Sequence, residues 1–505
     1  MYIVTAKEMY EMDRHTIQEI GLDERLLMEN AGRAVSSKIT GIISKQNQIC
    51  IFVGSGNNGG DGFVIARTLH TQNYNVTVLQ IVPDERITGE ALYHKTLYLN
   101  CNGSVHVSSD ATEVDKFVTS SDVIIDAMIG IGVHDELREP VYTIVSIINQ
   151  KADFVISVDI PTGLPADEGI TGFSAIHADW TFVIEAAKMS LFLEHTAPYY
   201  GKWEVVPIGI SINTMDDVPK KYTWGEHHFR NTLPKRDPYA HKGTHGKGLA
   251  IGGSVEMPGS IAMTAKAALR AGAGLLTVGT AKNVISSIAQ TCIEATYLMV
   301  DDHNEHGGKA AAIPFERFDC IVMGMGMGRD KEAERLVMHV LNEANCPVIV
   351  DADGLFHVKA DPSILSKRSD PIIVTPHPGE MAMLLEVPIA ELLEKPFHYS
   401  RAFAAIHQVY VVLKGKHTII TVPDGKQAVN QTGNQGLAKG GSGDVLSGII
   451  LAMVMQHKNI FQALCNACFV HGAAADLLIR DNHSYYDLLA TDVIEGIPAV
   501  YRTFL

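Results

Sequence analysis

Positive charge and cysteine are both scarce in this chain of 505 residues, and each scarcity excludes a class of protein. Lys and Arg number 41 against 57 Asp and Glu, so the formal net charge is −16. A chain this acidic lacks the clustered basic residues of a nucleic-acid-binding protein, although helix N-termini and a few lysines can still form a local anion site. Seven cysteines are too few, and odd in number, for a disulfide framework, which favours a reducing compartment.

Long apolar runs are also missing. Residues 446–455 form one of the longest, and this run is far short of the ~18 residues that a membrane span needs. The first eight residues have neither the basic flank nor the apolar run of a signal peptide. Hydrophobic residues make up 46% of the chain, a typical share for a globular protein. The sequence therefore predicts a cytoplasmic globular protein that binds neither nucleic acid nor a membrane.

Short apolar runs alternate with helical patterns along the whole chain. The expected strands of the first half are residues 49–53, 76–82, 123–125, 154–158, 181–184 and 205–208. Those of the second half are residues 249–251, 275–278, 320–323, 348–350, 372–374, 409–413 and 418–422, and the strongest helices are residues 260–271, 443–455 and 460–479. Strands that are buried on both faces and alternate with helices predict an α/β fold with mostly parallel sheets.

This pattern lapses between residues 210 and 242, where Asp, Lys and Pro accumulate. Such a stretch is typical of a domain boundary. At roughly 150 residues per domain, the length alone allows two to four domains. Two α/β domains, residues 1–212 and residues 225–505, fit the pattern best.

A glycine-rich loop follows the first expected strand. Residues 54–62 read Gly-Ser-Gly-Asn-Asn-Gly-Gly-Asp-Gly and lead into a helix. Glycines at these positions let backbone N–H groups approach a phosphate, and the helix adds its positive end. A tight turn alone explains the glycines equally well, but it does not require the two Asn and the Asp. Their oxygens suit a hard cation or a sugar hydroxyl.

Two later runs place a carboxylate at the end of a strand. Asp126 ends the run Val-Ile-Ile-Asp, and Asp159 follows Ile-Ser-Val. In open parallel sheets, ligands bind beyond the carboxyl ends of the strands. An isolated Asp at such a place is often only a helix N-cap. Three polar strand ends at one sheet edge instead predict a ligand site.

These three segments resemble the NAD(P)H-hydrate epimerase family, and the resemblance covers residues 1–210. It implies a Rossmann-like three-layer domain with potassium held by Asn58, Asp126 and Thr162, and with Asp159 as the acid or base at the reacting ring. Oxygen ligands alone do not select potassium over sodium. The residues that the resemblance assigns to the nicotinamide-nucleotide substrate are Asn57, Asn58, Gly59, Gly60, Asp61, Gly130, Ile131, Gly132, Val133, His134, Asp135, Glu136 and Asp159.

A second glycine-rich loop opens an apolar helix in the second half. Residues 438–444 read Ala-Lys-Gly-Gly-Ser-Gly-Asp. A glycine nest at a helix N-terminus forms an anion hole for a phosphoryl group, and Asp444 can take a proton from a hydroxyl beside it. An Asp in the first helical turn is common for electrostatic reasons alone. The glycines before it favour the functional interpretation.

Two further motifs lie next to strands, and the chain has no Walker A element, so a nucleotide must be held in another way. Residues 375–380 read Thr-Pro-His-Pro-Gly-Glu, and the prolines on both sides of His377 stiffen its loop. Residues 413–418 read Leu-Lys-Gly-Lys-His-Thr between two strands, where Lys414 and Lys416 can meet phosphates or simply decorate an exposed hairpin.

With the turn at residues 257–260, these motifs resemble the ADP/ATP-dependent NAD(P)H-hydrate dehydratase family of the ribokinase-like superfamily, over about residues 225–505. The resemblance implies that ADP or ATP, with magnesium, contacts Lys414, Gly415, Lys416, His417, Thr418 and Gly443. It implies that the hydrated substrate contacts Ser260, Gly326, His377 and Asp444, with Asp444 catalytic. Ser260 stands where Ala is common among relatives.

Both resemblances in this order make the chain similar to bifunctional NAD(P)H-hydrate repair enzymes. They imply epimerisation of the R and S hydrates of NADH and NADPH, followed by nucleotide-dependent dehydration of the S hydrate. Phosphorylation of the hydroxyl would turn a poor leaving group into a good one. The alternative is a ribokinase-like small-molecule kinase with a non-catalytic, nucleotide-binding N-terminal module.

Apolar helix faces in the first domain predict a homo-oligomer.

Overall fold

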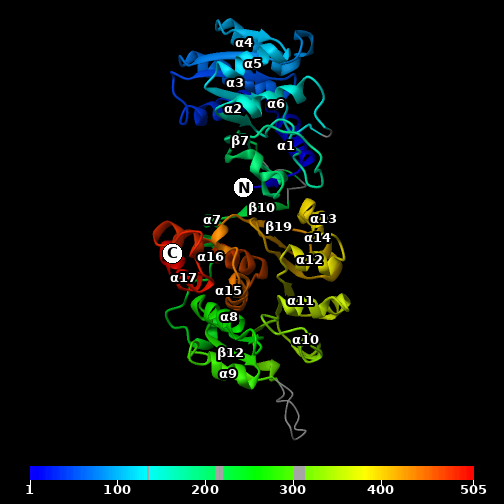
Figure 1. Ribbon diagram of the computed structural model, residues 1–505, viewed down its shortest axis with the longest axis vertical. Helices are drawn as coiled ribbons and strands as arrows, with labels where there is room; N and C mark the ends of the chain where they lie inside the picture. The colour runs from blue at the N-terminus through cyan, green and yellow to red at the C-terminus, as the bar shows by residue number, and fades with distance from the viewer. Residues whose placement is uncertain (134–135, 211–214, 216–219, 301–312, 505) are drawn as a thin grey trace. The chain divides into compact units, whose positions relative to one another are not determined.

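The computed structural model describes residues 1–133, 136–210, 215, 220–300 and 313–504. The chain divides into two compact units, Met1–Pro219 and Lys220–Leu505 (Figure 1). Each unit has its own sheet and its own helices, so each is described by itself.

Unit 1 contains a seven-stranded sheet in the order β4-β3-β2-β5-β6-β7-β9, in which all pairings are parallel. The strands are β2 (Gln48–Val53), β3 (Asn75–Gln80), β4 (Val105–Val107), β5 (Val123–Ala127), β6 (Val155–Val158), β7 (Trp180–Ile184) and β9 (Lys202–Val206). A separate parallel pair is formed by β1 (Ile3–Val4) and β8 (Ala187–Lys188). The helices are α1 (Ala6–Gln18), α2 (Glu24–Ile39), α3 (Asn57–Thr71), α4 (Gly89–Asn100), α5 (Ala111–Thr119) and α6 (Val141–Lys151), with 3-10 turns η1 (Asp84–Arg86), η2 (Met189–Phe192) and η3 (Ala197–Tyr200).

Both faces of this sheet are covered. Ile49, Ile51 and Val53 of β2 face one core, which also takes side chains from α1 to α4. Cys50 and Phe52, the alternate residues of the same strand, face a second core with α5 and α6. Side chains of a strand point alternately to the two faces, so a strand covered on both sides is apolar throughout, as the sequence pattern of β2 predicts.

Unit 2 contains a ten-stranded sheet in the order β10-β19-β18-β17-β16-β15-β14-β11-β12-β13. The strands are β10 (Lys221–Trp224), β11 (Lys247–Ile251), β12 (Leu275–Thr280), β13 (Thr296–Met299), β14 (Cys320–Met323), β15 (Val348–Val350), β16 (Ile372–Val374), β17 (Tyr410–Leu413), β18 (Ile419–Thr421) and β19 (Gln427–Asn430). Among these described strands, the antiparallel pairings are β17–β18 and β18–β19.

Four helices of unit 2 pack against one another and against one face of the sheet. They are α8 (Pro258–Arg270), α15 (Ser442–Gln456), α16 (Ile460–Asp481) and α17 (Ala490–Phe504), and their apolar residues form one core with strand residues such as Ala250 and Ile373. Figure 1 shows α10 to α14 on the other side of the sheet. The remaining elements are α7 (Glu226–Thr232), α9 (Lys282–Ile288), α10 (Lys331–Glu343), α11 (Asp353–Val358), α12 (Pro378–Leu385), α13 (Ile389–Glu394), α14 (Pro396–His407), η4 (Lys242–His245), η5 (Phe315–Arg317), η6 (Pro362–Lys367) and η7 (Gln435–Leu437).

The prediction of an α/β fold with mostly parallel sheets is confirmed. The pattern did not indicate β4 or β13, because these strands at sheet edges are partly exposed and need no continuous apolar run. β10 and α7 lie within residues 210–242, where the periodic pattern lapses, and β10 pairs with β19.

One helix is long and apolar enough to cross a membrane by length and composition alone. It is α16, and 78% of its most apolar window is buried inside the protein. The core helix of a globular protein has the same composition, and α16 contributes to the main core of unit 2. The sequence predicts that no segment is long and apolar enough to span a membrane. By length and composition, α16 contradicts that prediction.

Each sheet has one point at which the strand order reverses. In unit 1 the chain runs from β2 outwards through β3 and β4 and then returns to β5 on the other side of β2. In unit 2 it runs from β11 through β12 and β13 and returns to β14. Open α/β sheets bind ligands outside the carboxyl ends of the two strands at such a reversal. The loops after β2 and β5, and after β11 and β14, are therefore where the sites are expected.

Candidate active sites

A cavity of about 770 Å³ lies at the strand reversal of unit 1. α1 and α2 line it together with the loops that follow β2 and β5. These two loops touch, since a Cβ on Gly54 would lie only 2.0 Å from the carbonyl oxygen of Met128. The predicted substrate residues that line this cavity are Asn57, Asn58, Asp61, Gly130, Ile131, Gly132 and Asp159.

The other predicted substrate residues of unit 1 have different positions. Gly59 and Gly60 lie in the first turn of α3, where a Cβ would approach the Gly54 carbonyl oxygen to 2.1 Å and the Met28 sulfur to 2.4 Å, respectively. Their small size thus allows α3 to pack closely. Among the described residues, Val133 and Glu136 do not line the cavity, and His134 and Asp135 lie outside the described part of the chain.

A buried lysine anchors Asp159 in this cavity. Lys188 is fully buried, and its Nζ donates to Oδ1 of Asp159 and, at 3.1 Å each, to the backbone oxygens of Ile184 and Ala186. The backbone N–H of Ile184 donates to the same Oδ1 at 2.9 Å. Asp159 also has a φ of +66°, a strained backbone conformation for a residue other than glycine that is found most often at functional sites.

The three predicted potassium ligands lie at the ends of neighbouring elements. Asp126, fully buried at the end of β5, accepts hydrogen bonds from Ser157 Oγ at 2.9 Å and from the Thr162 N and Oγ1 at 2.8 and 2.6 Å. Burial nevertheless raises the pKa of the Asp126 carboxyl above its usual value. Oδ1 and Nδ2 of Asn58 are both buried and have no hydrogen-bond partner among the described residues. A buried amide without partners fits a ligand of a hard cation. Asp126 and Thr162, which are hydrogen-bonded to each other, are not among the described residues that line the cavity.

Unit 2 has a cavity of about 950 Å³ at the N-terminus of α15. Gly441 directly precedes α15 and has a φ of +90°, a backbone conformation that favours glycine. This conformation lets the loop before Gly441 lead directly into α15. The predicted nucleotide residues that line this cavity are Lys414, Gly415, Lys416, Thr418 and Gly443, and His377 lines it as well. His417 is not among the described lining residues; burial, with a smaller contribution from Lys416, lowers the pKa of its ring to about 4.

Ser260, Gly326 and Asp444 come together at the strand reversal of unit 2. Gly326 has a φ of +60°, and a Cβ on it would lie 3.0 Å from the Cβ of Ser260. Ser260 is also a hydrogen-bond partner of the Asp444 side chain. Burial first, and the negative charge of Asp351 second, raise the pKa of Asp444 to about 6. A carboxylate with a pKa in this range is suited to accept a proton near neutral pH.

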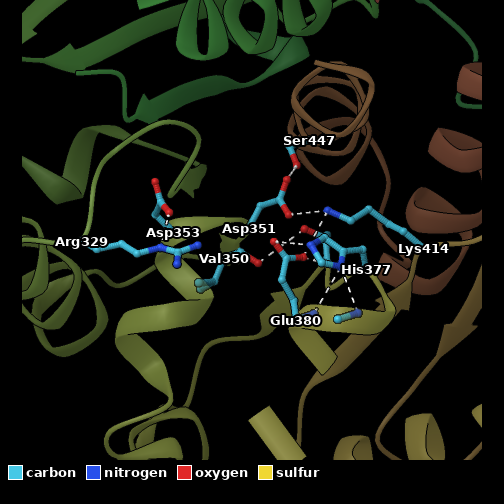
Figure 2. A network of polar contacts seen from close by, with 10 residues as sticks. Arg329, Val350, Asp351, Asp353, His377, Glu380, Lys414 and Ser447 are labelled. Atoms are coloured by element: carbon cyan, nitrogen blue, oxygen red, sulfur yellow. Dashed lines mark hydrogen bonds and ion pairs between the residues drawn. The ribbon is translucent and has the colours of Figure 1, made fainter. Parts of the chain in front are cut away.

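A network of charges connects the part of this cavity lined by Lys414 to the sheet (Figure 2). Lys414 Nζ lies 2.7 Å from Oδ1 of the buried Asp351, whose Oδ2 accepts from Ser447 Oγ at 2.6 Å. Glu380 lies 3.8 Å from Lys414 and 3.4 Å from the His377 ring. Although burial acts in the opposite direction, Asp351 and Glu380 raise the pKa of Lys414 above its usual value. Lys414 is therefore a fixed positive charge.

His377 has a local structural role in addition to its place on the cavity wall. Its Nδ1 caps α12 by accepting from the backbone N–H groups of Gly379 and Glu380 at 3.0 and 3.3 Å. The Glu380 carboxylate accepts in return from the His377 backbone N–H at 2.8 Å. The stiff loop that the two prolines predict is thus held by a capping box.

Several residues of these sites were not found from the sequence. Asp351 directly follows the strand β15, so the reasoning that selected Asp126 and Asp159 could have selected it. Lys188 and Asp13 carry no motif. His471 of α16 lines the unit 2 cavity with its Nε2 buried and unpartnered among the described residues, and burial lowers its pKa to about 4. A neutral imidazole at this place can act as an acceptor.

Comparison with known proteins gives two family models that match in order. Residues 24–190 match the model described as YjeF-related protein N-terminus, and residues 249–499 match the model described as NAD(P)H-hydrate dehydratase. The models therefore match one segment in each unit.

The relatives resemble the chain over nearly all of its length. A bifunctional NAD(P)H-hydrate repair enzyme from Moorella thermoacetica is 33% identical over 522 residues, which covers 99% of this chain and 97% of the relative. The enzyme of the same name from Escherichia coli is 31% identical over 98% of this chain and 93% of its own length. These matches do not favour the alternative of a small-molecule kinase with a non-catalytic N-terminal module.

Unit 2 also has relatives of its own. An ADP-dependent (S)-NAD(P)H-hydrate dehydratase from Bacillus subtilis is 42% identical over 56% of this chain and 98% of the relative. A crystal structure of an ADP/ATP-dependent NAD(P)H-hydrate dehydratase from Bacillus subtilis, co-crystallised with ATP and Mg²⁺, is 39% identical over 56% of this chain, with a TM-score of 0.49. With both models and the full-length relatives in agreement, this chain belongs to the family of bifunctional NAD(P)H-hydrate repair enzymes.

Proposed function

We propose that this chain repairs hydrated NADH and NADPH in two steps, one in each unit. Unit 1 interconverts the R and S hydrates, and unit 2 dehydrates the S hydrate with ADP or ATP. The observation that carries this proposal is the full-length match to bifunctional repair enzymes together with a cavity at the strand reversal of unit 1 and a second cavity beside the reversal of unit 2.

In unit 2 the phosphate end of the nucleotide binds at the N-terminus of α15 beside Lys414. Gly443 lines this end next to Lys414, since a Cβ there would make an ordinary van der Waals contact with Lys414 Nζ at 3.5 Å. The backbone N–H groups of a helix N-terminus and a fixed lysine stabilise negative charge that develops on a phosphoryl group. Asp444 accepts the proton of the substrate hydroxyl, next to Ser260 and Gly326. The terminal phosphoryl group of the nucleotide moves to the hydroxyl oxygen, and its bond to the rest of the nucleotide breaks. Loss of phosphate together with a proton from the adjacent ring carbon then restores the dihydronicotinamide ring.

Magnesium belongs to this step in our proposal. Among the described residues no group of three or more His, Cys, Asp and Glu side chains could hold a metal ion. This fits a magnesium ion that is held mainly by nucleotide phosphates and water, with one or two carboxylates. It would neutralise phosphate charge during transfer.

In unit 1 we assign the nicotinamide nucleotide to the cavity lined by Asn57, Asp61 and the loop at residues 130–132, with Asp159 at the reacting ring. The unpartnered Asn58 amide and the oxygens of Asp126 and Thr162 would hold potassium, which would bind phosphate charge and order the two loops. Asp159 holds or accepts a proton at its carboxylate, which Lys188 keeps in place.

The assembly and compartment are also proposals. Leu92, Tyr93 and Leu99 of α4 are apolar or aromatic and exposed, which supports a homo-oligomer. The scarcity of cysteine supports the cytoplasm. Light scattering of the purified protein would measure the mass of the particle in solution. A mass equal to that of one chain would contradict the homo-oligomer.

The direct test of the function is a spectrophotometric assay with a mixture of both NADH hydrates, magnesium, potassium and ADP or ATP. We expect the dihydronicotinamide absorbance to return fully and only when nucleotide is present. Recovery that stops at the share of the S hydrate would contradict the epimerase assignment of unit 1. Absence of any recovery would contradict the dehydratase assignment of unit 2.

A further inference from the structure

Asp13 lies in the same cavity as Asp159 but on a different wall. Asp13 is on α1, whereas Asp159 directly follows β6. Within the described part of the chain, the carboxylate of Asp13 makes no hydrogen bond or ion pair, while that of Asp159 is held by Lys188 and Ile184. The cavity therefore has an anchored carboxylate, Asp159, and an unengaged one, Asp13, while Asp61 and Glu24 also line it.

The charges around Asp13 come from every wall of the cavity. Asp159 lies after β6, Glu24 on α2, Asp61 on α3 and Glu185 after β7, and Lys188 is the main counter-charge. Arg14 of α1 also lines the cavity. Burial, and then the net effect of these charges, raise the pKa of Asp13 to about 7. Two carboxylates in unlike environments can divide acid and base roles between them.

The chemistry of the substrate calls for this division. Water adds to an enamine with the hydroxyl on the carbon next to nitrogen, because the other alkene carbon takes the proton. Epimerisation at that carbon by loss and return of water needs an acid for the leaving hydroxyl on one face. It needs a base for the entering water on the other face. A single carboxylate on one face cannot serve both.

We propose that Asp13 is the second acid–base residue of the epimerase, paired with Asp159 on the opposite face of the substrate ring. The Asp13 carboxyl donates its proton to the hydroxyl, the carbon–oxygen bond breaks, and the lone pair of the ring nitrogen forms the C=N bond of an iminium ion. Another water then attacks the other face and gives its proton to the Asp159 carboxylate. The reverse reaction exchanges the two roles. The pair carries one proton before and after each epimerisation and none while the iminium ion is present, because that proton has left with the departing water.

This inference rests on the proposed function of unit 1, and it deepens that function by naming the path. The path replaces the hydroxyl oxygen with one from water in every epimerisation. In a path through ring opening, the carbon–nitrogen bond breaks instead and the oxygen stays. Epimerisation by the wild-type chain in H₂¹⁸O should therefore place one ¹⁸O in each newly formed epimer. Retention of ¹⁶O in the first turnovers would overturn the proposal.

The variant test compares Asp13→Asn with Glu11→Gln, which removes a carboxylate from the same helix at a residue that does not line the cavity. Asp13→Asn should slow epimerisation by roughly 10²–10⁴-fold, the usual contribution of a general acid or base. Glu11→Gln should keep it within about 2-fold. Epimerisation by Asp13→Asn at more than a tenth of the wild-type rate would overturn the assignment.

Two further measurements separate this result from its alternatives. Asp13→Asn should still dehydrate the S hydrate with nucleotide at the wild-type rate, since that step lies in unit 2. If Asp13→Asn does not fold, Asp13→Glu replaces it, and we expect activity with a displaced pH profile; an unchanged profile would overturn the proposal. If the wild-type chain itself does not epimerise the hydrates, the proposed function of unit 1 is wrong rather than the role of Asp13.

Discussion

Lys414 and Asp351 form an ion pair, with 2.7 Å between Nζ and Oδ1, that joins the ends of β17 and β15. Asp351 is almost fully buried and Lys414 is 18% exposed. Removal of Asp351 would leave Lys414 largely buried, with Glu380 at 3.8 Å as its remaining close counter-charge. The pair therefore connects two strand ends and also holds a positive charge beside the α15 N-terminus in the unit 2 cavity.

Asp351→Asn should destabilise unit 2 by about 1–3 kcal/mol, because Lys414 loses its nearest counter-charge and keeps only the more distant Glu380 at 3.8 Å. The double variant Asp351→Asn/Lys414→Met should lose less than the sum of its single variants. Calorimetric unfolding measures all three. Lys439→Met, at an exposed lysine on the same cavity, is the control and should stay within about 0.5 kcal/mol. A loss below about 1 kcal/mol for Asp351→Asn would show that the pair is not structurally important.

Asp444→Asn should abolish nucleotide-dependent dehydration and leave epimerisation intact. An amide cannot accept the hydroxyl proton, and we expect a rate loss of at least ~10²-fold. In the wild-type chain the dehydration rate should fall below pH 6, since the pKa of Asp444 is about 6 and its ionised form is required. A dehydration rate that is independent of pH between 5 and 8 would contradict the role of Asp444 as base, and equal loss of both activities would contradict separate sites.

The same substitution should stabilise unit 2 at neutral pH. The pKa of Asp444 is about 6 in the folded chain against an ordinary value of 3.8, so between about pH 4 and pH 6 the folded state holds a proton that the unfolded state has lost. The stability of the wild-type chain relative to Asp444→Asn should thus decline from about pH 4 to pH 6 and stay constant above. The expected gain at pH 7 is roughly 1–3 kcal/mol. If the stability of the wild-type chain instead rises relative to that of Asp444→Asn between pH 4 and pH 6, the pKa of Asp444 is not raised in the folded state and the prediction is wrong.

Gly448→Ala should destabilise the contact between α15 and α8. Its Cβ would lie 2.2 Å from the carbonyl oxygen of Thr264 and 2.9 Å from the Cβ of Ala267. We expect a loss of about 1–3 kcal/mol from overpacking, despite the better helix propensity of Ala. Gly259→Ala in α8 is the matched control, because a Cβ there meets nothing within 4 Å. The prediction fails if both variants have the same melting temperature.

Potassium should stabilise unit 1 through Asn58. The buried amide has no partner in the part of the chain that the structure describes, and an unsatisfied buried polar group costs about 1–3 kcal/mol. KCl should raise the melting temperature of unit 1 above its value in tetramethylammonium chloride at equal ionic strength. Asn58→Leu should remove this difference, whereas Asn75→Ala, at an exposed position, should keep it. Equal melting temperatures in both salts for the wild-type chain would exclude a potassium site there.

The sequence predicts the strand ends well and the side chains that meet there only in part. Asp126, Asp159 and the loop at residues 54–62 could be selected because the strand-to-loop order is local and parallel strands end at one edge of the sheet. Lys188 could not be selected as the partner of Asp159, because 29 residues separate them. No sequence pattern shows that the segment after β7 folds back to the end of β6. Asp13 on α1 depends in the same way on how a helix packs across the sheet end.

The amino-acid sequence by itself determined the α/β class, the order of the strands along the chain, and the two glycine-rich helix N-termini. These features follow from hydrophobic periodicity and backbone conformation, which act over a few residues. Only the tertiary structure decided which charges meet: Asp351 with Lys414 across 63 residues and with Ser447 across 96. Such contacts depend on sheet order and helix packing, and their electrostatic effects depend on burial, which no single segment of the sequence contains.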